Sequence, residues 1–113
     1  MALQILEHKE EGYQRKVDFE HWTVALMNYA PKLTREGLTY IERDMETDDV
    51  FVLLTGTASL LIGEEMEEGP MEPNRIYNVE KGTWHATLLS EDAQVLIVEN
   101  SDTSRANSEY KDI

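Results

Sequence analysis

Apolar and polar residues alternate through the middle of the chain, a pattern that is typical of β-strands with one buried face. Trp22, Val24 and Leu26 share one face of a segment that continues to Asn28, and the residues between them share the other face. Because the segment is rich in β-branched and aromatic residues, we interpret it as a strand, which Pro31 ends.

Further runs of the same kind follow at short intervals, and residues that favour turns separate them. The acidic stretch 64–73 contains a glycine and two prolines, so we expect a loop there. Only the C-terminal residues allow a short helical stripe. Many short strands with regular turns predict an all-β sandwich or barrel. The strands that we expect after residue 28 cover residues 38–44, 50–54, 58–62, 75–79, 83–89 and 93–100.

The two ends of the chain are more polar than its middle. We interpret residues 1–20 as an N-terminal arm with one short strand near residues 13–17. Residues 101–113 are expected to form a polar loop or a loosely docked tail. No repeat, linker or low-complexity tract divides the chain, so we expect a single domain over residues 1–113.

The charge of the chain excludes several classes of partner. Its 23 acidic and 10 basic residues give a formal net charge of −13, and no basic stripe reverses this locally. Such a chain repels phosphate backbones and anionic membranes, so we expect neither nucleic-acid binding nor membrane binding. No apolar run approaches the roughly 20 residues of a membrane-spanning helix. The chain has no cysteine and no secretory signal that we can recognise, and we expect a cytoplasmic protein.

The stretch 42–56, ERDMETDDVFVLLTG, is the part of the sequence richest in candidate chemistry. Glu42 and Asp44 are two residues apart and therefore point to the same face of a strand. Asp49 opens the next apolar run, and a short turn between the two runs would bring the three acids to one end of a hairpin. Downstream, the run KGTWH contributes a histidine, His85.

The spacing of these residues resembles that of the two cupin motifs. The first cupin motif contains two histidines spaced HxH, then a glutamate and, seven residues later, a glycine. Here Asp49 stands at the glutamate position, and Gly56 follows seven residues later. Glu42 and Asp44 stand where the two histidines would be. The second motif, a glycine followed by two residues and a histidine, resembles the run GTWH that ends at His85.

The resemblance covers roughly residues 35–100, most of one domain. It implies a double-stranded β-helix, which is a jelly-roll barrel. Two positions of the second motif depart from the family pattern, since Glu80 replaces a proline and Leu89 replaces an asparagine. The family spans isomerases, dioxygenases, lyases, storage proteins and sugar-binding modules, so the fold alone does not select a function.

The resemblance also implies a site for a metal ion, with altered ligands. In a typical metal-binding cupin, three histidines and one carboxylate hold a divalent ion. Only His85 and Asp49 keep those residue types, while Glu42 and Asp44 offer carboxylate oxygens in place of imidazole nitrogens. The site therefore holds either no metal or an ion that prefers oxygen ligands, with Mn²⁺, Mg²⁺ or Ca²⁺ favoured over Zn²⁺.

Three carboxylates at close range cannot all stay ionised without compensation, because like charges raise one another's pKa. A cation would neutralise them, as would a base such as Arg43, Arg75 or Lys81. Otherwise one acid is protonated, or the mouth of the barrel is wide and wet. In a further alternative, Glu42 and Asp44 are solvated residues at the end of a hairpin.

His85 is the candidate general acid or base, in partnership with one of the three acids, because imidazole titrates near neutral pH. The other two histidines, His8 and His21, lie outside the motifs, and we interpret both as surface or arm residues.

Four further residues are candidates for the wall of a ligand pocket. Tyr40 shares a strand face with two of the acids. Phe51 and Leu53 share a face with Asp49, although ordinary core packing explains both equally well. Tyr77 is the fourth candidate. Together they would give a pocket with an apolar floor and a polar rim, as small-molecule sites usually have.

Three functions remain in competition. The first is an isomerase or lyase that acts on a small polar metabolite, such as a sugar or a hydroxy acid, by acid/base chemistry. The second is a metal-dependent enzyme with an oxygen-rich site. The third is a non-catalytic module that senses a ligand or mediates assembly. In each case we expect a homodimer, because the N-terminal arm could be exchanged with a second copy.

Overall fold

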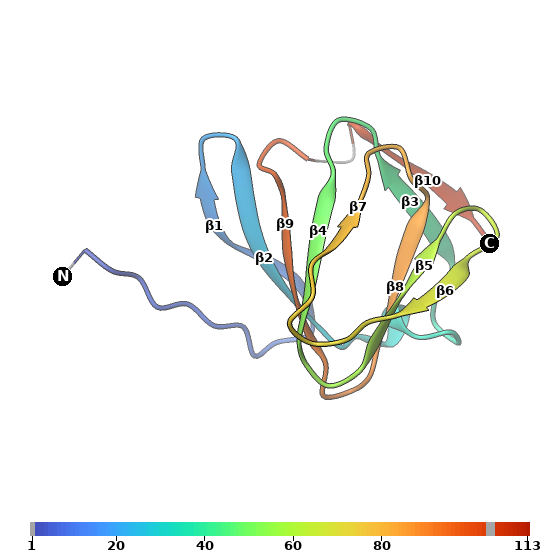
Figure 1. Ribbon diagram of the computed structural model, residues 1–113, viewed down its shortest axis with the longest axis horizontal. Coiled ribbons are helices and arrows are strands. Elements are labelled where there is room, and N and C mark those ends of the chain that lie inside the picture. The colour runs from blue at the N-terminus through green and yellow to red at the C-terminus, as the bar shows by residue number, and fades with distance from the viewer. Residues whose placement is uncertain (1, 104–105) are drawn as a thin grey trace.

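In the described part of the chain, ten strands form two five-stranded antiparallel sheets that face each other as the walls of a barrel (Figure 1). The computed structural model describes residues 2–103 and 106–113, so Met1 of the expected arm and residues 104–105 of the expected tail lie outside the described part. Within that part the helical content is one 3-10 turn, η1 (Pro31–Leu33), and the all-β prediction is confirmed.

The first sheet has the order β1 (Gly12–Phe19), β2 (Trp22–Asn28), β9 (Gln94–Asn100), β4 (Asp49–Thr55) and β7 (Tyr77–Val79). The second has the order β10 (Ser108–Asp112), β3 (Tyr40–Asp44), β8 (His85–Leu89), β5 (Ala58–Ile62) and β6 (Glu67–Pro70).

The main hydrophobic core lies between the two sheets. Buried and partly exposed residues alternate along β2, β4 and β9, as expected for strands that turn one face inward. Val95 is fully buried at the centre, and both sheets contribute to the cluster around it. Its other buried members are Ala25, Met27, Phe51, Leu53, Ala58, Leu60, Met71, Val79, Leu89, Ala93 and Ile97.

A second, smaller cluster contains Ile41, Leu61 and Ala86, from three neighbouring strands of the second sheet. Since Ile41 lies between Tyr40 and Glu42 on β3, its side chain points away from the barrel interior. Trp84 packs against this cluster and is covered by the guanidinium group of Arg43, 4.5 Å from the ring centroid. Trp84 is therefore a packing residue on the outside of the second sheet.

Gly56 makes the turn between β4 and β5 possible. Its φ angle is +70°, in the left-handed region that only glycine adopts without strain. A Cβ atom at this position would lie 2.6 Å from the backbone of Ala93. The glycine of the first motif thus allows two chain segments to approach closely at the end of the barrel opposite the acidic residues.

One predicted connection is wrong. We expected the segment between Asp44 and Asp49 to close a hairpin, but β3 and β4 belong to different sheets and do not pair. The segment crosses from one sheet to the other, as jelly-roll topology requires. Asp44 and Asp49 still come close together, because the two strands face each other across the barrel.

Two segments that were expected to be irregular are edge strands. Residues 67–70, in the expected loop, pair with β5 as β6, and residues 108–112, in the expected tail, pair with β3 as β10. All four residues of β6 are exposed, and β10 is mostly exposed. Edge strands can be built from polar residues and tolerate proline, so hydrophobic patterning does not reveal them.

The N-terminal arm is shorter than expected, because β1 already begins at Gly12 and pairs with β2 of the same chain. The first of the described residues run away from the barrel (Figure 1), whereas the residues just before β1 stay against it, since Asn28 donates to the carbonyls of His8 and Glu10. His8, expected at the surface, is buried, and its Nε2 donates to the carbonyl of Gly12 at 2.8 Å. Beyond this anchor the arm exposes apolar side chains, with Ile5 84% and Leu3 60% exposed.

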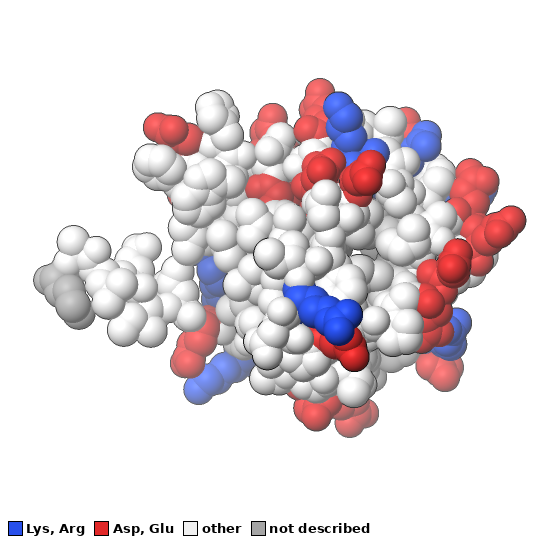
Figure 2. All heavy atoms as spheres, in the orientation of Figure 1, with Lys and Arg blue, Asp and Glu red and all other residues white. Residues whose placement is uncertain are grey.

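Charge is distributed over the surface without a basic region on the visible face. In Figure 2 the Lys and Arg side chains lie in separate small groups among acidic and uncharged residues. Among the described residues, no helix has the length and hydrophobicity needed to cross a membrane.

Candidate functional site

A cavity of about 360 Å³ opens between the two sheets. Four of the residues singled out from the sequence motifs line it: Glu42, Asp44, Asp49 and His85. Its volume lies in the range of small-molecule sites, roughly 300–1,000 Å³.

The pairing of β3 with its two neighbours places one wall of this cavity. Glu42 lies directly opposite His85 on β8 and opposite Tyr110 on β10. Asp44, two residues further, lies opposite Ser108. Because residues that face each other across antiparallel strands point to the same side, all five side chains share the inner face of the second sheet.

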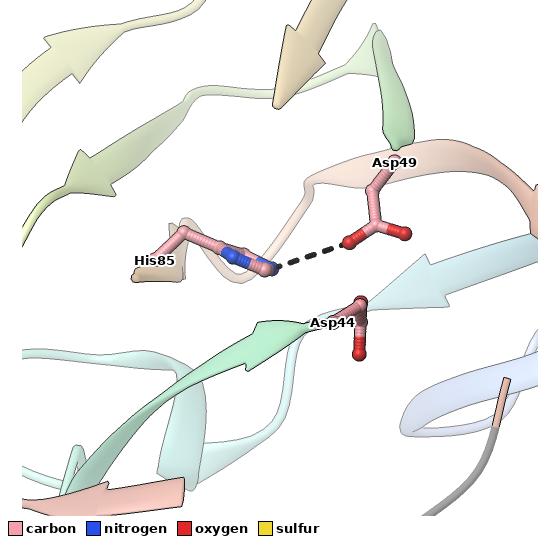
Figure 3. Close-up of side chains that lie close together, drawn as sticks. All are labelled: Asp44, Asp49 and His85. Carbon is pink, nitrogen blue, oxygen red and sulfur yellow. Dashed lines mark ion pairs between the residues drawn. The ribbon is translucent and has the colours of Figure 1, made fainter. Parts of the chain in front are cut away.

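Asp49 approaches this wall from the opposite sheet. Its Oδ2 lies 3.6 Å from Nε2 of His85, and both side chains are buried (Figure 3). Asp44 lies beside the pair, and its Oδ1 accepts a hydrogen bond of 2.5 Å from the hydroxyl of Ser108. Asp44, Asp49 and His85 each offer one ligand atom within 4.8 Å of the others. The structure thus brings these three residues together, through a different connection from the one expected.

Two turns hold the cluster in place. The carboxylate of Asp48 accepts hydrogen bonds from the backbone N–H of Lys81, at 2.8 Å, and from the side chain of Asn78, at 3.0 Å. The backbone N–H of Gly82 donates to the carbonyl of Asp44 at 2.7 Å. Both contacts tie the turn before His85 to the segment that carries the acids. Asn78 and the backbone of Lys81 also lower the pKa of Asp48.

The histidine tautomer follows from one hydrogen bond. Nδ1 of His85 lies 2.9 Å from the carbonyl oxygen of Thr83, which can only accept, so Nδ1 carries a proton. In the neutral imidazole, Nε2 then has a free lone pair, which faces Asp49. This arrangement suits either proton transfer or metal binding at Nε2.

Burial changes the acidity of two carboxyl groups. Removal from water, followed by the neighbouring carboxylates of Asp44 and Glu99, raises the pKa of Asp49 to about 10. Burial is also the main cause that raises the pKa of Glu42; His85 opposes this shift, and Asp44 adds to it. In the absence of a bound cation, Asp49 is therefore protonated at neutral pH.

The residues predicted to form the pocket wall fall into two groups. Tyr40 and Phe51 line the cavity. The ring of Phe51 packs edge-on against His85, with centroids 5.9 Å apart. Leu53 is instead buried in the main core, and Tyr77 packs against that core with its hydroxyl accepting from the N–H of Glu72. These two side chains are not among the lining residues, because they lie further along the barrel.

Several lining residues were missed by the sequence interpretation. Tyr13 and Arg15 come from β1, Glu99 from β9, and Lys32 from η1. The hydroxyl of Tyr13 donates to Glu99 at 2.6 Å, and burial together with this bond raises the pKa of Tyr13. The alternation of residues along β1 and β9 indicates which strand face Tyr13, Arg15 and Glu99 occupy. No sequence motif indicates that this face meets the acidic residues.

The three bases proposed from the sequence do not line the cavity. Arg43 pairs with Glu109 on the outside of the second sheet, and Arg75 pairs with Glu72. Lys81 lies in the turn that Asp48 binds through the backbone. Compensation by these side chains is therefore a wrong prediction.

The donor atoms present fit a divalent ion. Two carboxylates and one imidazole lie close enough to share an ion, and Nδ1 of His85 is already held by a carbonyl, as is usual for a metal-binding histidine. Oδ1 of Asp49 is buried and receives no hydrogen bond from the described residues. The expected ligand Glu42 is not part of this close group. The set of two oxygens and one nitrogen favours Mn²⁺ or Mg²⁺ over softer ions.

Comparison with known proteins identifies the fold. Neither a protein-family model nor a curated protein sequence matches this chain. Solved structures do: a cupin-2 domain protein from Shewanella frigidimarina aligns with a TM-score of 0.62 and 15% identity, over 81% of this chain and 84% of that one. An RmlC-like cupin with a double-stranded β-helix from Methanocaldococcus jannaschii aligns with a TM-score of 0.60 and 14% identity, over 88% and 92% of the two chains.

A third similar structure is Pac13, described as a nucleoside dehydratase; variants of the Streptomyces protein are known with uridine. It aligns with a TM-score of 0.63 and 12% identity, over 94% of this chain and 83% of that one. At such identities the likeness concerns the fold alone. The predicted cupin fold, a jelly-roll barrel, is confirmed.

Proposed function

We propose that this cupin-fold chain is an isomerase or lyase that acts on a small polar metabolite by acid/base chemistry. The observation that carries the proposal is the buried pair of His85 Nε2 and Asp49 Oδ2, 3.6 Å apart inside a cavity large enough for a small molecule. Paired titratable groups whose environments differ are the usual arrangement for proton transfer in enzymes.

The two groups offer complementary proton-transfer roles in the metal-free protein. In its neutral form His85 presents the lone pair of Nε2 and can take a proton from a carbon or hydroxyl of the substrate. Asp49 is protonated at neutral pH and can give its proton to a leaving hydroxyl or to a carbonyl oxygen. In an elimination, the carbon–hydrogen electrons form the new double bond, the carbon–oxygen bond breaks, and water leaves. Transfer of the proton from Nε2 back to Asp49 restores the starting state.

The remaining cavity residues position the pair. Ser108 fixes one oxygen of Asp44, which keeps that carboxylate beside Asp49 and favours the protonated state of Asp49. Phe51 packs against the imidazole ring and limits its rotation. A divalent ion bound by Asp44, Asp49 and His85 would instead polarise a substrate oxygen as a Lewis acid.

Deuterium exchange tests the proposal. Metal-free protein is incubated in deuterated water with pooled sugars, amino sugars and sugar-derived hydroxy compounds, and mass spectrometry follows the uptake of deuterium or the loss of one water. We expect turnover of at least one compound by the wild type and its loss in His85→Gln and Asp49→Asn, each checked for folding by circular dichroism.

The exposed His21→Gln variant is the matched control and is expected to keep the wild-type rate, because His21 lies at the tip of the β1–β2 hairpin. Turnover that survives both substitutions in the pair would contradict the proposed mechanism. Ligand binding without any turnover would instead favour the non-catalytic sensing module.

A further inference from the structure

The interior of the cavity carries more negative than positive groups. Asp44 and Asp49 are buried, and the side chain of Glu99 is only 10% exposed. On the positive side, Arg15 lies 3.8 Å from Glu99 and donates hydrogen bonds to the carbonyls of Ser101 and Thr103, at 2.9 and 2.5 Å. With Glu42 a fourth carboxyl group faces the same space, while the other cationic side chain that lines it, Lys32, is exposed.

One of these carboxyl groups lacks a hydrogen-bond donor. Asp49 is 3% exposed, and its Oδ1 receives no hydrogen bond from the described residues. Neighbouring Asp44 and Glu99 carry only acceptor oxygens when they are ionised, so they cannot satisfy it. A buried carboxyl oxygen without a donor is unfavourable, and a ligand that brings N–H groups would supply the missing bond.

The walls of the cavity are aromatic as well as acidic. Tyr40 and Tyr110 meet edge to face with centroids 5.6 Å apart, and Phe51 closes the side next to His85. Aromatic faces attract cations, and the volume of about 360 Å³ far exceeds what a single hydrated metal ion would need. Carboxylates combined with aromatic rings are typical of sites that bind organic ammonium groups.

We infer that the ligand of this cavity is a small organic cation with a protonated amine, whose N–H groups donate to carboxyl oxygens of Asp49, Glu42 and Glu99. The inference rests on the proposed function, since it names the substrate class of the same site. It also disfavours a hydroxy acid, one of the two substrate classes considered from the sequence, because a ligand carboxylate would face four protein carboxyl groups.

Three compounds that share one skeleton test the charge preference directly. Glucosamine, glucose and gluconate share a six-carbon chain and carry a positive, zero or negative charge, with gluconate in open-chain form. Isothermal titration of each into EDTA-treated protein at neutral pH is expected to show binding of glucosamine at least tenfold tighter than that of glucose, and no binding of gluconate. A factor of ten corresponds to about 1.4 kcal/mol, at the low end for a hydrogen bond to a charged group.

Variants show whether the cavity carboxylates cause the preference. Glu99→Gln and Glu42→Gln each remove one charge and are expected to weaken glucosamine binding roughly tenfold without a matching loss for glucose. Glu65→Gln removes an exposed charge outside the cavity and is the control, expected to leave both affinities unchanged. Since the wild-type comparison needs no variant, a folding defect in one of them does not prevent the test.

Equal binding of the three compounds, or tighter binding of gluconate, would overturn the inference. So would gluconate binding that appears only after Mn²⁺ is added, because the cation in the cavity would then be a metal. Failure of the cation preference is distinguishable from failure of the proposed function. Deuterium exchange on a neutral sugar would still support acid/base catalysis by His85 and Asp49.

Discussion

Replacement of Asp49 by asparagine should change how the stability of the protein depends on pH. Burial beside Asp44 and Glu99 raises the pKa of Asp49 to about 10, whereas an aspartate in an unfolded chain titrates near pH 3.9. Between these values the folded state binds one proton more than the unfolded state. The free energy of unfolding therefore falls as pH rises, by at most about 1.4 kcal/mol per pH unit.

The contribution is fully present below about pH 4 and is lost as pH rises toward 10. Over the three units from about pH 5 to pH 8 the loss reaches at most about 4 kcal/mol, a large part of the roughly 5–15 kcal/mol that stabilises a domain. An asparagine side chain has no group that ionises in this range, so the Asp49→Asn variant should lose this slope and be more stable than the wild type at pH 8. Glu42, whose pKa is also raised, keeps a residual slope of the same sign.

Urea unfolding followed by tryptophan fluorescence, at several pH values and with EDTA present, gives the slope directly. Asp48→Asn is the matched control, because it removes an exposed acid from the same segment whose pKa is lowered and which stays ionised throughout this range. The reasoning is refuted if Asp49→Asn keeps the wild-type slope, or if the wild type gains stability as pH rises from 5 to 8.

Three other outcomes follow from the structure. Gly56→Ala should destabilise the protein by about 2 kcal/mol or more in thermal unfolding, because a Cβ would meet the backbone of Ala93. Gly63 also has a positive φ but has open space around it, so Gly63→Ala should cost only about 1 kcal/mol. Equal losses would contradict the close approach at Gly56. Ser108→Ala removes the hydrogen-bond donor to buried Asp44 and should lower the free energy of unfolding in urea by about 1–2 kcal/mol. The control Ser59→Ala breaks an exposed serine–carboxylate hydrogen bond and should change it little. Equal effects of the two variants would argue against β10 as a wall of the site. Ile5→Asp should convert the expected arm-exchanged dimer to monomer in light scattering, and Ile76→Asp, at a similarly exposed position, is the control. A monomeric wild type would rule out the dimer.

The spacing of motif residues predicted the fold, and it singled out residues that the structure brings together. Gly56, seven residues after Asp49, occupies a turn that only glycine can make, and alternation along β3 placed Glu42 and Asp44 on one face. These predictions succeeded because they depend on local backbone geometry, which a short stretch of sequence determines.

The parts that failed depend on contacts between distant segments. A connection between two strands looks the same whether it closes a hairpin or crosses between sheets, so the path from Asp44 to Asp49 was misassigned. Edge strand β10 has too few apolar residues to show a pattern, which hid Ser108 and Tyr110. Arg15 lines the cavity only because β1 folds back onto β2.

The central claim is that Asp49 is a protonated carboxyl group facing His85. Carbon NMR of protein labelled with ¹³C at the aspartate carboxyl groups measures this directly, with Asp49→Asn identifying the resonance. In metal-free protein the Asp49 signal should keep the chemical shift of a protonated carboxyl at neutral pH and begin to titrate only well above it. A signal that is already that of an ionised carboxylate at neutral pH would contradict the account.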